Sequence, residues 1–123
     1  MDMKEFSQMN LIRCEAPDGF NHRINDWSSS DWMTATMGEL GEAANIVKKL
    51  NRSRDGIRGN KESDDMLKAK LVTELADTFI YLDLFMQSLR HKTDKVIMQV
   101  FNQKSKEKGM PYFIGNERSP FLG

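Results

Sequence analysis

Apolar residues recur three or four positions apart over most of the chain, which is the spacing of one face of an α-helix. No stretch alternates apolar and polar residues as a half-buried strand does. The spacing predicts four helices, over residues 3–12, from Ser28 to about Leu50, from about Ser63 to Arg90 and from Thr93 to about Lys108. The pattern therefore predicts an all-α fold, a helical bundle of four to five helices.

Capping signals lie close to these predicted ends. Ser28 is followed three residues later by Asp31, which approximates a capping box with aspartate in place of glutamate. Thr93 or Asp94 is expected to cap the last helix, and Gly109 is expected to stop it.

Between the helices, Asp18-Gly19 predicts a turn, and the polar segment 51–65 predicts a loop. Gly38 and Gly41 lie inside a predicted helix although glycine is a poor helix former. Close approach of another helix or of a ligand would account for both glycines.

The composition places few limits on function. A chain of 123 residues predicts one domain, with a core over about 27–111 and an irregular tail over 112–123. Lysine plus arginine equals aspartate plus glutamate at 18 each, so the charge balance gives no argument for a nucleic-acid or membrane partner. Cys14 is the single cysteine, and the N-terminus does not resemble a signal peptide. We therefore expect a cytoplasmic protein without an internal disulfide.

Two pairs of acids stand out on the two long predicted helices. Glu39 and Glu42 are three residues apart and share a helix face, and Glu74 and Asp77 repeat this spacing. The neighbouring apolar residues predict that both pairs are largely buried; they include Met37, Leu40, Leu75 and Phe79. Acids in such surroundings repel each other unless a cation compensates their charge. The pattern predicts a divalent-metal site, and the alternative is a solvated acidic stripe on each helix.

The ligand types indicate which metal such a site would hold. A di-iron bundle requires a histidine three residues after a glutamate on two helices, whereas Asn45 and Ile80 follow the two acidic pairs here. His22 and His91 lie outside both acidic faces and are expected to be ordinary histidines. A site built only from oxygen ligands favours Mg²⁺, with Mn²⁺ as the second choice.

Three segments in this order resemble the MazG-like all-α nucleotide pyrophosphohydrolases. They are GELGEAANIVKKL within residues 32–50, ELADTFIYLDL from residue 74, and FNQKSKEKGMP over 101–111. The resemblance implies a Mg²⁺-dependent enzyme that hydrolyses a nucleoside triphosphate to the monophosphate and pyrophosphate, and a homodimer or homotetramer. Glu39, Glu42, Glu74 and Asp77 match the metal ligands of that family. Some relatives carry further acids where this chain has Gly38 and Thr73, which leaves the number of metal ions open.

Hydrolysis also requires a group that accepts a proton from water, and Glu39 or Glu42 is our choice for this catalytic role.

Phosphate and base contacts are expected from both long helices and from the last one. Lys49 follows Glu42 on nearly the same face, and Trp32 and Tyr81 are candidates to stack on a base; the alternative for both aromatic residues is a place in the core. Two polar residues of the FNQK segment, Asn102 and Lys104, are further candidates for phosphate or sugar contacts.

Asp83 lies on the opposite side of its helix from Glu74. We interpret it as a residue that pairs helices, not as a metal ligand.

Two rival functions stay open at this point. One is a non-catalytic helical module that senses nucleotides or binds a protein, and the other is a purely structural bundle.

Overall fold

A computed structural model describes residues 1–115 of the chain. Within that range it contains four α-helices, one short 3-10 helix and no strand, which confirms the all-α prediction. The elements are α1 (Met3–Glu15), η1 (Ile24–Asp26), α2 (Ser29–Arg54), α3 (Asp64–Ser88) and α4 (Thr93–Glu107). None of these helices combines the length and the apolar character that crossing a membrane requires. The predicted irregular tail lies outside the described residues from position 116 onward.

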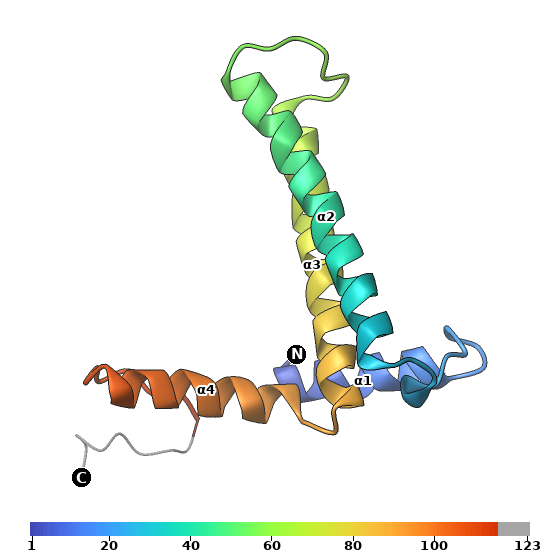
Figure 1. Ribbon diagram of the computed structural model, residues 1–123, viewed down its shortest axis with the longest axis vertical. Coiled ribbons are helices and arrows are strands. Elements are labelled where there is room, and N and C mark those ends of the chain that lie inside the picture. Colours follow the sequence, from blue (N-terminus) through green and yellow to red (C-terminus); the bar gives the residue numbers. More distant parts are fainter. Residues whose placement is uncertain (116–123) are drawn as a thin grey trace.

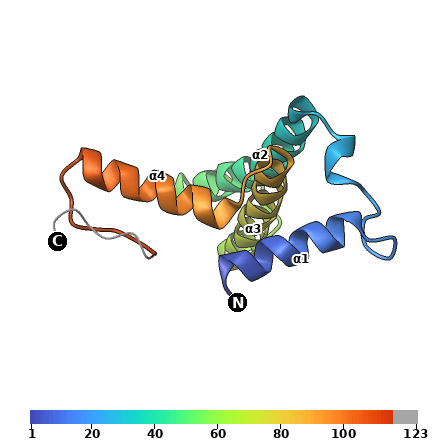
Figure 2. The same ribbon diagram turned by 90° about the horizontal axis from the view of Figure 1, so that it is seen from below.

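The two long helices, α2 and α3, run antiparallel and side by side as a hairpin (Figure 1). Both α1 and α4 lie across the base of this hairpin and extend from it in different directions (Figures 1 and 2). Helix α4 contacts α1 and α3 but not α2. The fold is therefore an elongated hairpin with two shorter helices at one end.

Helix α2 begins where the sequence predicts. The Ser28 hydroxyl accepts a hydrogen bond from the Asp31 amide at 3.3 Å, and the Asp31 carboxylate accepts one from the Ser28 amide at 2.9 Å. This reciprocal capping box satisfies two amides that otherwise lack partners at a helix start. Ser63 caps α3 in the simpler way, by accepting from the Met66 amide at 3.2 Å.

Several other helix ends differ from the prediction. Helix α2 continues four residues past Leu50 to Arg54, because no glycine or proline interrupts it before Gly56, whose φ is +72°. The expected cap of α4 by Thr93 or Asp94 is wrong. Lys92 precedes α4 without a capping side chain, and Thr93 lies inside the helix.

A tight turn after α1 brings the following segment back against that helix. A Cβ at Gly19 would lie 2.1 Å from the carbonyl oxygen of Arg13, so only glycine fits there. The returning chain then bonds to α1, since the Phe20 amide donates to Arg13 O at 2.9 Å and the His22 amide to Cys14 O at 2.8 Å. This turn holds the His22 ring close to the base of the hairpin.

The core lies where α1, η1, α2 and α3 meet. Cys14, Trp32 and Leu84 are buried, and Ile24, Trp27, Tyr81 and Phe85 pack around them. Burial raises the pKa of the Cys14 thiol, which donates a hydrogen bond to His22 O at 3.1 Å. Four chain segments are therefore fixed relative to one another at this end of the molecule.

Further along the hairpin, the prediction of burial around the acids is wrong for a single chain. Leu75 is 41% exposed, Phe79 64% and Met37 54%. A Cβ added at Gly38 or at Gly41 would meet no atom within 4 Å. The expected close contact with another helix is therefore not found at these glycines among the described residues.

Candidate metal centre

Three of the four predicted metal ligands come together between the two long helices. One carboxylate oxygen each from Glu39, Glu74 and Asp77 lies within 4.8 Å of the other two. Glu39 belongs to α2, whereas Glu74 and Asp77 belong to α3, and all three side chains are half-buried. Glu42 lies one turn further along α2, is exposed, and stands beside this triad without belonging to it. The antiparallel pairing of the helices thus brings acids about 35 residues apart in the sequence to one site.

The pKa of Glu74 reflects the crowding of these carboxylates. A hydrogen bond with Glu42, partial burial and the charges of Glu42 and Glu39 raise the pKa of Glu74 from 4.5 to about 7. When all of these carboxylates are ionised, no donor faces the Glu74 Oε2 atom, which is buried and has no hydrogen-bond partner. A buried anionic oxygen without a donor calls for either a proton or a cation. The chemistry of this donor set therefore fits a hard divalent cation.

This crowding predicts how stability depends on pH when no metal is added. The folded protein holds a proton on Glu74 more tightly than the unfolded chain does, so the free energy of unfolding should fall as pH rises between about 4.5 and 7. Thermal melts from pH 4.5 to pH 8 in a chelating buffer measure this slope. Mg²⁺ should restore the melting temperature at pH 8, and Glu74→Gln should flatten the slope. An identical slope in wild type and variant would contradict the prediction.

An aromatic cavity of about 470 Å³ adjoins the acids at the base of the hairpin. The edge of the His22 ring packs against Trp27 with 4.6 Å between centroids, and Trp27 packs against Trp32 at 4.7 Å. The cavity is lined by Asn10, Arg13, Cys14, Phe20, His22, Trp27, Trp32, Glu39, Asp77, Ile80, Tyr81 and Leu84. It therefore joins planar apolar walls to two members of the acidic triad, which suits a ligand with a ring at one end and an anionic group that binds metal at the other.

Both aromatic residues that the sequence singled out line this cavity. Trp32 is only 1% exposed, which confirms its place in the core, and its stacking on a base stays a prediction. Burial, followed by the charges of Glu39 and Asp77, raises the pKa of Tyr81. The Tyr81 hydroxyl therefore stays protonated near the acids and remains able to donate a hydrogen bond.

A second cavity of about 460 Å³ lies on the other side of the acids, toward the hairpin tip. Its charged lining consists of three acids, Glu42, Glu62 and Glu74, and two lysines, Lys49 and Lys70. Lys70 also forms an ion pair with Glu62, which lowers the pKa of that carboxyl. Lys49 thus lies beside Glu42 as the sequence predicts, and Lys70 joins it from α3.

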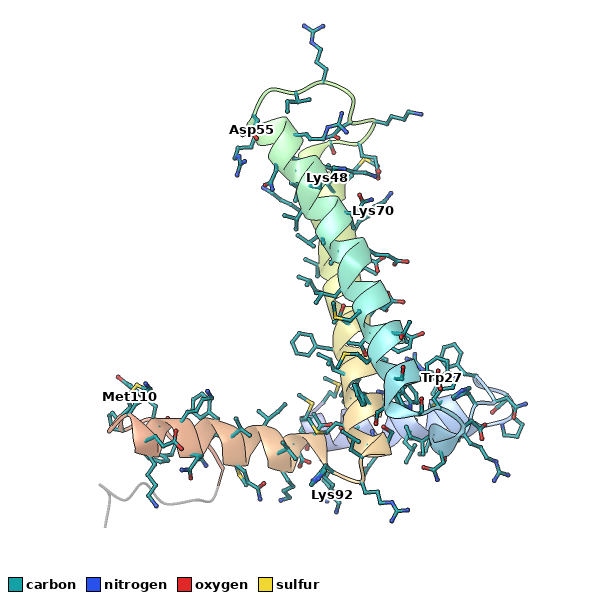
Figure 3. The ribbon with its side chains drawn as sticks, viewed as in Figure 1. Trp27, Lys48, Asp55, Lys70, Lys92 and Met110 are labelled. Atoms are coloured by element: carbon teal, nitrogen blue, oxygen red, sulfur yellow. The ribbon has the colours of Figure 1, made fainter. Side chains whose placement is uncertain are left out.

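The acids therefore lie between the aromatic cavity and the cavity that contains the two lysines. Trp27 lies at the base of the hairpin, and Lys70 and Lys48 lie toward the far end (Figure 3). The segment 55–63 at the tip is fastened to α2, because Asn60 donates to Lys49 O at 2.7 Å and Arg52 to Arg58 O at 3.2 Å. These hydrogen bonds hold the tip segment against the helix that carries Lys49.

The two candidates on α4 do not join this site in a single chain. Asn102 is 3% exposed, and its carboxamide bonds to the backbone N–H and C=O of Ile114, both at 2.9 Å. Lys104 is exposed on the same helix, which makes no contact with α2. The structure gives Asn102 a role in holding the segment after α4 against that helix.

Several residues near the acids were not predicted from the sequence. Asn10, Arg13, Phe20 and His22 all come from the first 25 residues, where the apolar pattern is weak. Only the spacing of Asn10 and Cys14, four apart on one helix face, indicates a buried surface there.

Neither a scan of protein-family models nor searches of curated proteins and solved structures finds a match to this chain.

Proposed function

We propose that this protein is a Mg²⁺-dependent nucleoside triphosphate pyrophosphohydrolase, which converts a (d)NTP and water to the (d)NMP and pyrophosphate. One observation carries the proposal: the acids of α2 and α3 lie between an aromatic cavity and a cavity with two lysines. A nucleotide has a planar base at one end, a phosphate chain at the other and a need for metal between them. The order of chemical groups along the hairpin suits that ligand.

Glu39, Glu74 and Asp77 are the residues that would hold the metal. Mg²⁺ bound there would neutralise phosphate charge and orient the phosphate chain relative to the attacking water. The buried oxygen of Glu74 without a donor supports this assignment. The oxygen-only ligand set also admits Mn²⁺.

Glu42 is the residue that we assign as the proton acceptor. It stands next to the triad and is exposed, so water can reach its carboxylate. In the proposed step the water oxygen bonds to the α-phosphorus, the bond from this phosphorus to the bridging oxygen breaks, and the water proton passes to Glu42. Pyrophosphate leaves with the bridging oxygen, and Lys49 offsets part of its charge.

The direct test is to incubate the purified protein with each NTP and dNTP and with Mg²⁺. We expect nucleoside monophosphate and pyrophosphate in equal amounts, and a loss of turnover in Glu42→Gln. Glu107→Gln, which removes an exposed acid on α4, is the matched control. Nucleotide binding without turnover would favour the non-catalytic alternative. Release of inorganic phosphate in place of pyrophosphate would overturn the proposed bond cleavage.

The same proposal includes a homo-oligomer, which the exposed apolar residues of the hairpin support. These residues are three, four or seven positions apart on each helix, so each set shares one face: Met33, Met37, Leu40 and Val47 on α2, and Val72, Leu75, Phe79 and Leu82 on α3. An apolar surface of this length is expected to be covered in solution. Pairing of two hairpins would bury both rows in one four-helix core.

Phe79→Glu is expected to convert the wild-type dimer or tetramer to a monomer. Phe79 is 64% exposed in the single chain, so the substitution costs little there but places a charge in the proposed interface. Sedimentation velocity at tens of micromolar measures the change. Lys95→Glu, an exposed charge reversal on α4, should leave the assembly unchanged. A monomeric wild type would remove this part of the proposal.

A further inference from the structure

Asn10 is a buried polar residue in the wall of the aromatic cavity. It lies on α1, is 5% exposed, and lines the aromatic cavity, and together with Ile80 it also lines a neighbouring apolar cavity near the N-terminus. A buried carboxamide has two N–H donors and one oxygen acceptor to satisfy. Where those groups bond determines what the cavity wall offers to a ligand.

Both donors of the Asn10 carboxamide are engaged by the protein. Its Nδ2 atom donates to Ile80 O at 3.0 Å and to the Asp83 Oδ2 atom at 2.8 Å. A flipped carboxamide would place its oxygen against these two acceptors, so the bonds fix which atom is nitrogen and which is oxygen.

Asp83 holds this arrangement rigidly. Its carboxylate is 1% exposed and also accepts hydrogen bonds from the Ser7 hydroxyl at 2.6 Å and the Thr93 hydroxyl at 2.5 Å. The Asp83 oxygens are therefore anchored from α1 and α4 as well as from α3. The carboxamide of Asn10 cannot rotate without breaking bonds to a buried anion.

The oxygen atom of the Asn10 carboxamide can still accept a hydrogen bond. No residue among 1–115 donates to Asn10 Oδ1, and this atom is not fully sealed from solvent. An acceptor fixed in this way distinguishes ligands by whether they present an N–H or an oxygen. It accepts a bond from an amine, and it repels a carbonyl at the same position.

We propose that Asn10 is a specificity-determining residue whose Oδ1 accepts a hydrogen bond from the exocyclic amine of a nucleobase held in the aromatic cavity. This inference rests on the proposed function, which supplies the nucleotide. Cytosine and adenine carry such an amine, whereas uracil and hypoxanthine carry a carbonyl at the corresponding position. The protein thus selects nucleotides with amino-bearing bases over their deaminated counterparts.

The test compares kcat/KM within two pairs of substrates, dCTP against dUTP and dATP against dITP. We expect the amino member of at least one pair to be preferred by about tenfold or more, the selectivity typical of one buried unsatisfied group. Asn10→Ala should bring that ratio close to one. Ser7→Ala removes another donor to Asp83 but leaves the carboxamide in place, so its ratio should match that of the wild type.

Binding of the monophosphates gives a second measurement that needs no turnover. Quenching of Trp27 and Trp32 fluorescence by dCMP, dUMP, dAMP and dIMP should show the same preference in the wild type, even if Asn10→Ala proves unstable. Equal affinities within both pairs, or a preference that survives in Asn10→Ala, would overturn the inference while leaving hydrolysis intact. Selective binding without hydrolysis of any triphosphate would support the role of Asn10 and refute the proposed reaction.

Discussion

Asp77→Asn is expected to lower nucleotide hydrolysis by about 100-fold or more without unfolding the protein. The Asp77 carboxylate is one of three whose oxygens lie within 4.8 Å of one another, and it also lines the aromatic cavity. A neutral amide would hold a divalent cation much more weakly. In the absence of metal the same substitution removes a charge from a crowded anionic cluster, so the melting temperature should stay constant or rise.

Opposite effects on activity and stability distinguish a metal ligand from a structural acid. Initial rates at saturating nucleotide over a range of Mg²⁺ concentrations, combined with thermal melts in a chelator, measure both quantities. Asp65→Asn is the matched control, because Asp65 is an exposed acid in the first turn of the same helix. Its effect on activity should be within twofold. An Asp77→Asn variant that keeps its activity, or that loses activity only because it unfolds, would refute the assignment.

The helices could be predicted because their information is local. Ser28 with Asp31, and Ser63 at the next start, mark helix starts through bonds between residues three apart. The prediction that Thr93 caps α4 failed because its hydroxyl donates to Asp83, ten residues away. The same competition between local and distant partners explains Asn102, which bonds to the backbone of Ile114. A capping or ligand pattern shows what a side chain is able to do, but not which partner it finds.

The acidic triad could be predicted because helical spacing alone places Glu39 and Glu42 on one face, and Glu74 and Asp77 on another. The aromatic cavity could not, because the tertiary fold creates it. His22 reaches Trp27 only through the tight turn at Gly19. The predicted burial near Phe79 failed for a related reason. Apolar spacing indicates an apolar helix face, but not whether another part of the chain packs on it.

Asp83→Ala is expected to destabilise the fold by about 3–5 kcal/mol, the largest effect of any single substitution proposed for this protein. Asp83 is 1% exposed and accepts four hydrogen bonds, from Ser7, Asn10, Gln87 and Thr93. Each donor left without a partner in the interior costs about 1–3 kcal/mol before relaxation. Urea unfolding measures the loss. Asp94→Ala, an acid in the first turn of α4, should cost less than about 1 kcal/mol.

The loss should be uneven along the chain, because among the described helices α4 contacts α1 and α3 but not α2. Thr93 at the start of α4 and Ser7 on α1 both donate to Asp83 Oδ1, so one carboxylate oxygen joins both shorter helices to the hairpin. Amide exchange in Asp83→Ala should therefore rise most in α4 and least in the centre of α2. Asp83→Asn keeps one acceptor oxygen and should give an intermediate loss. A uniform increase in exchange, or an unfolding free energy within about 1 kcal/mol of wild type, would show that α4 is held by its apolar contacts instead.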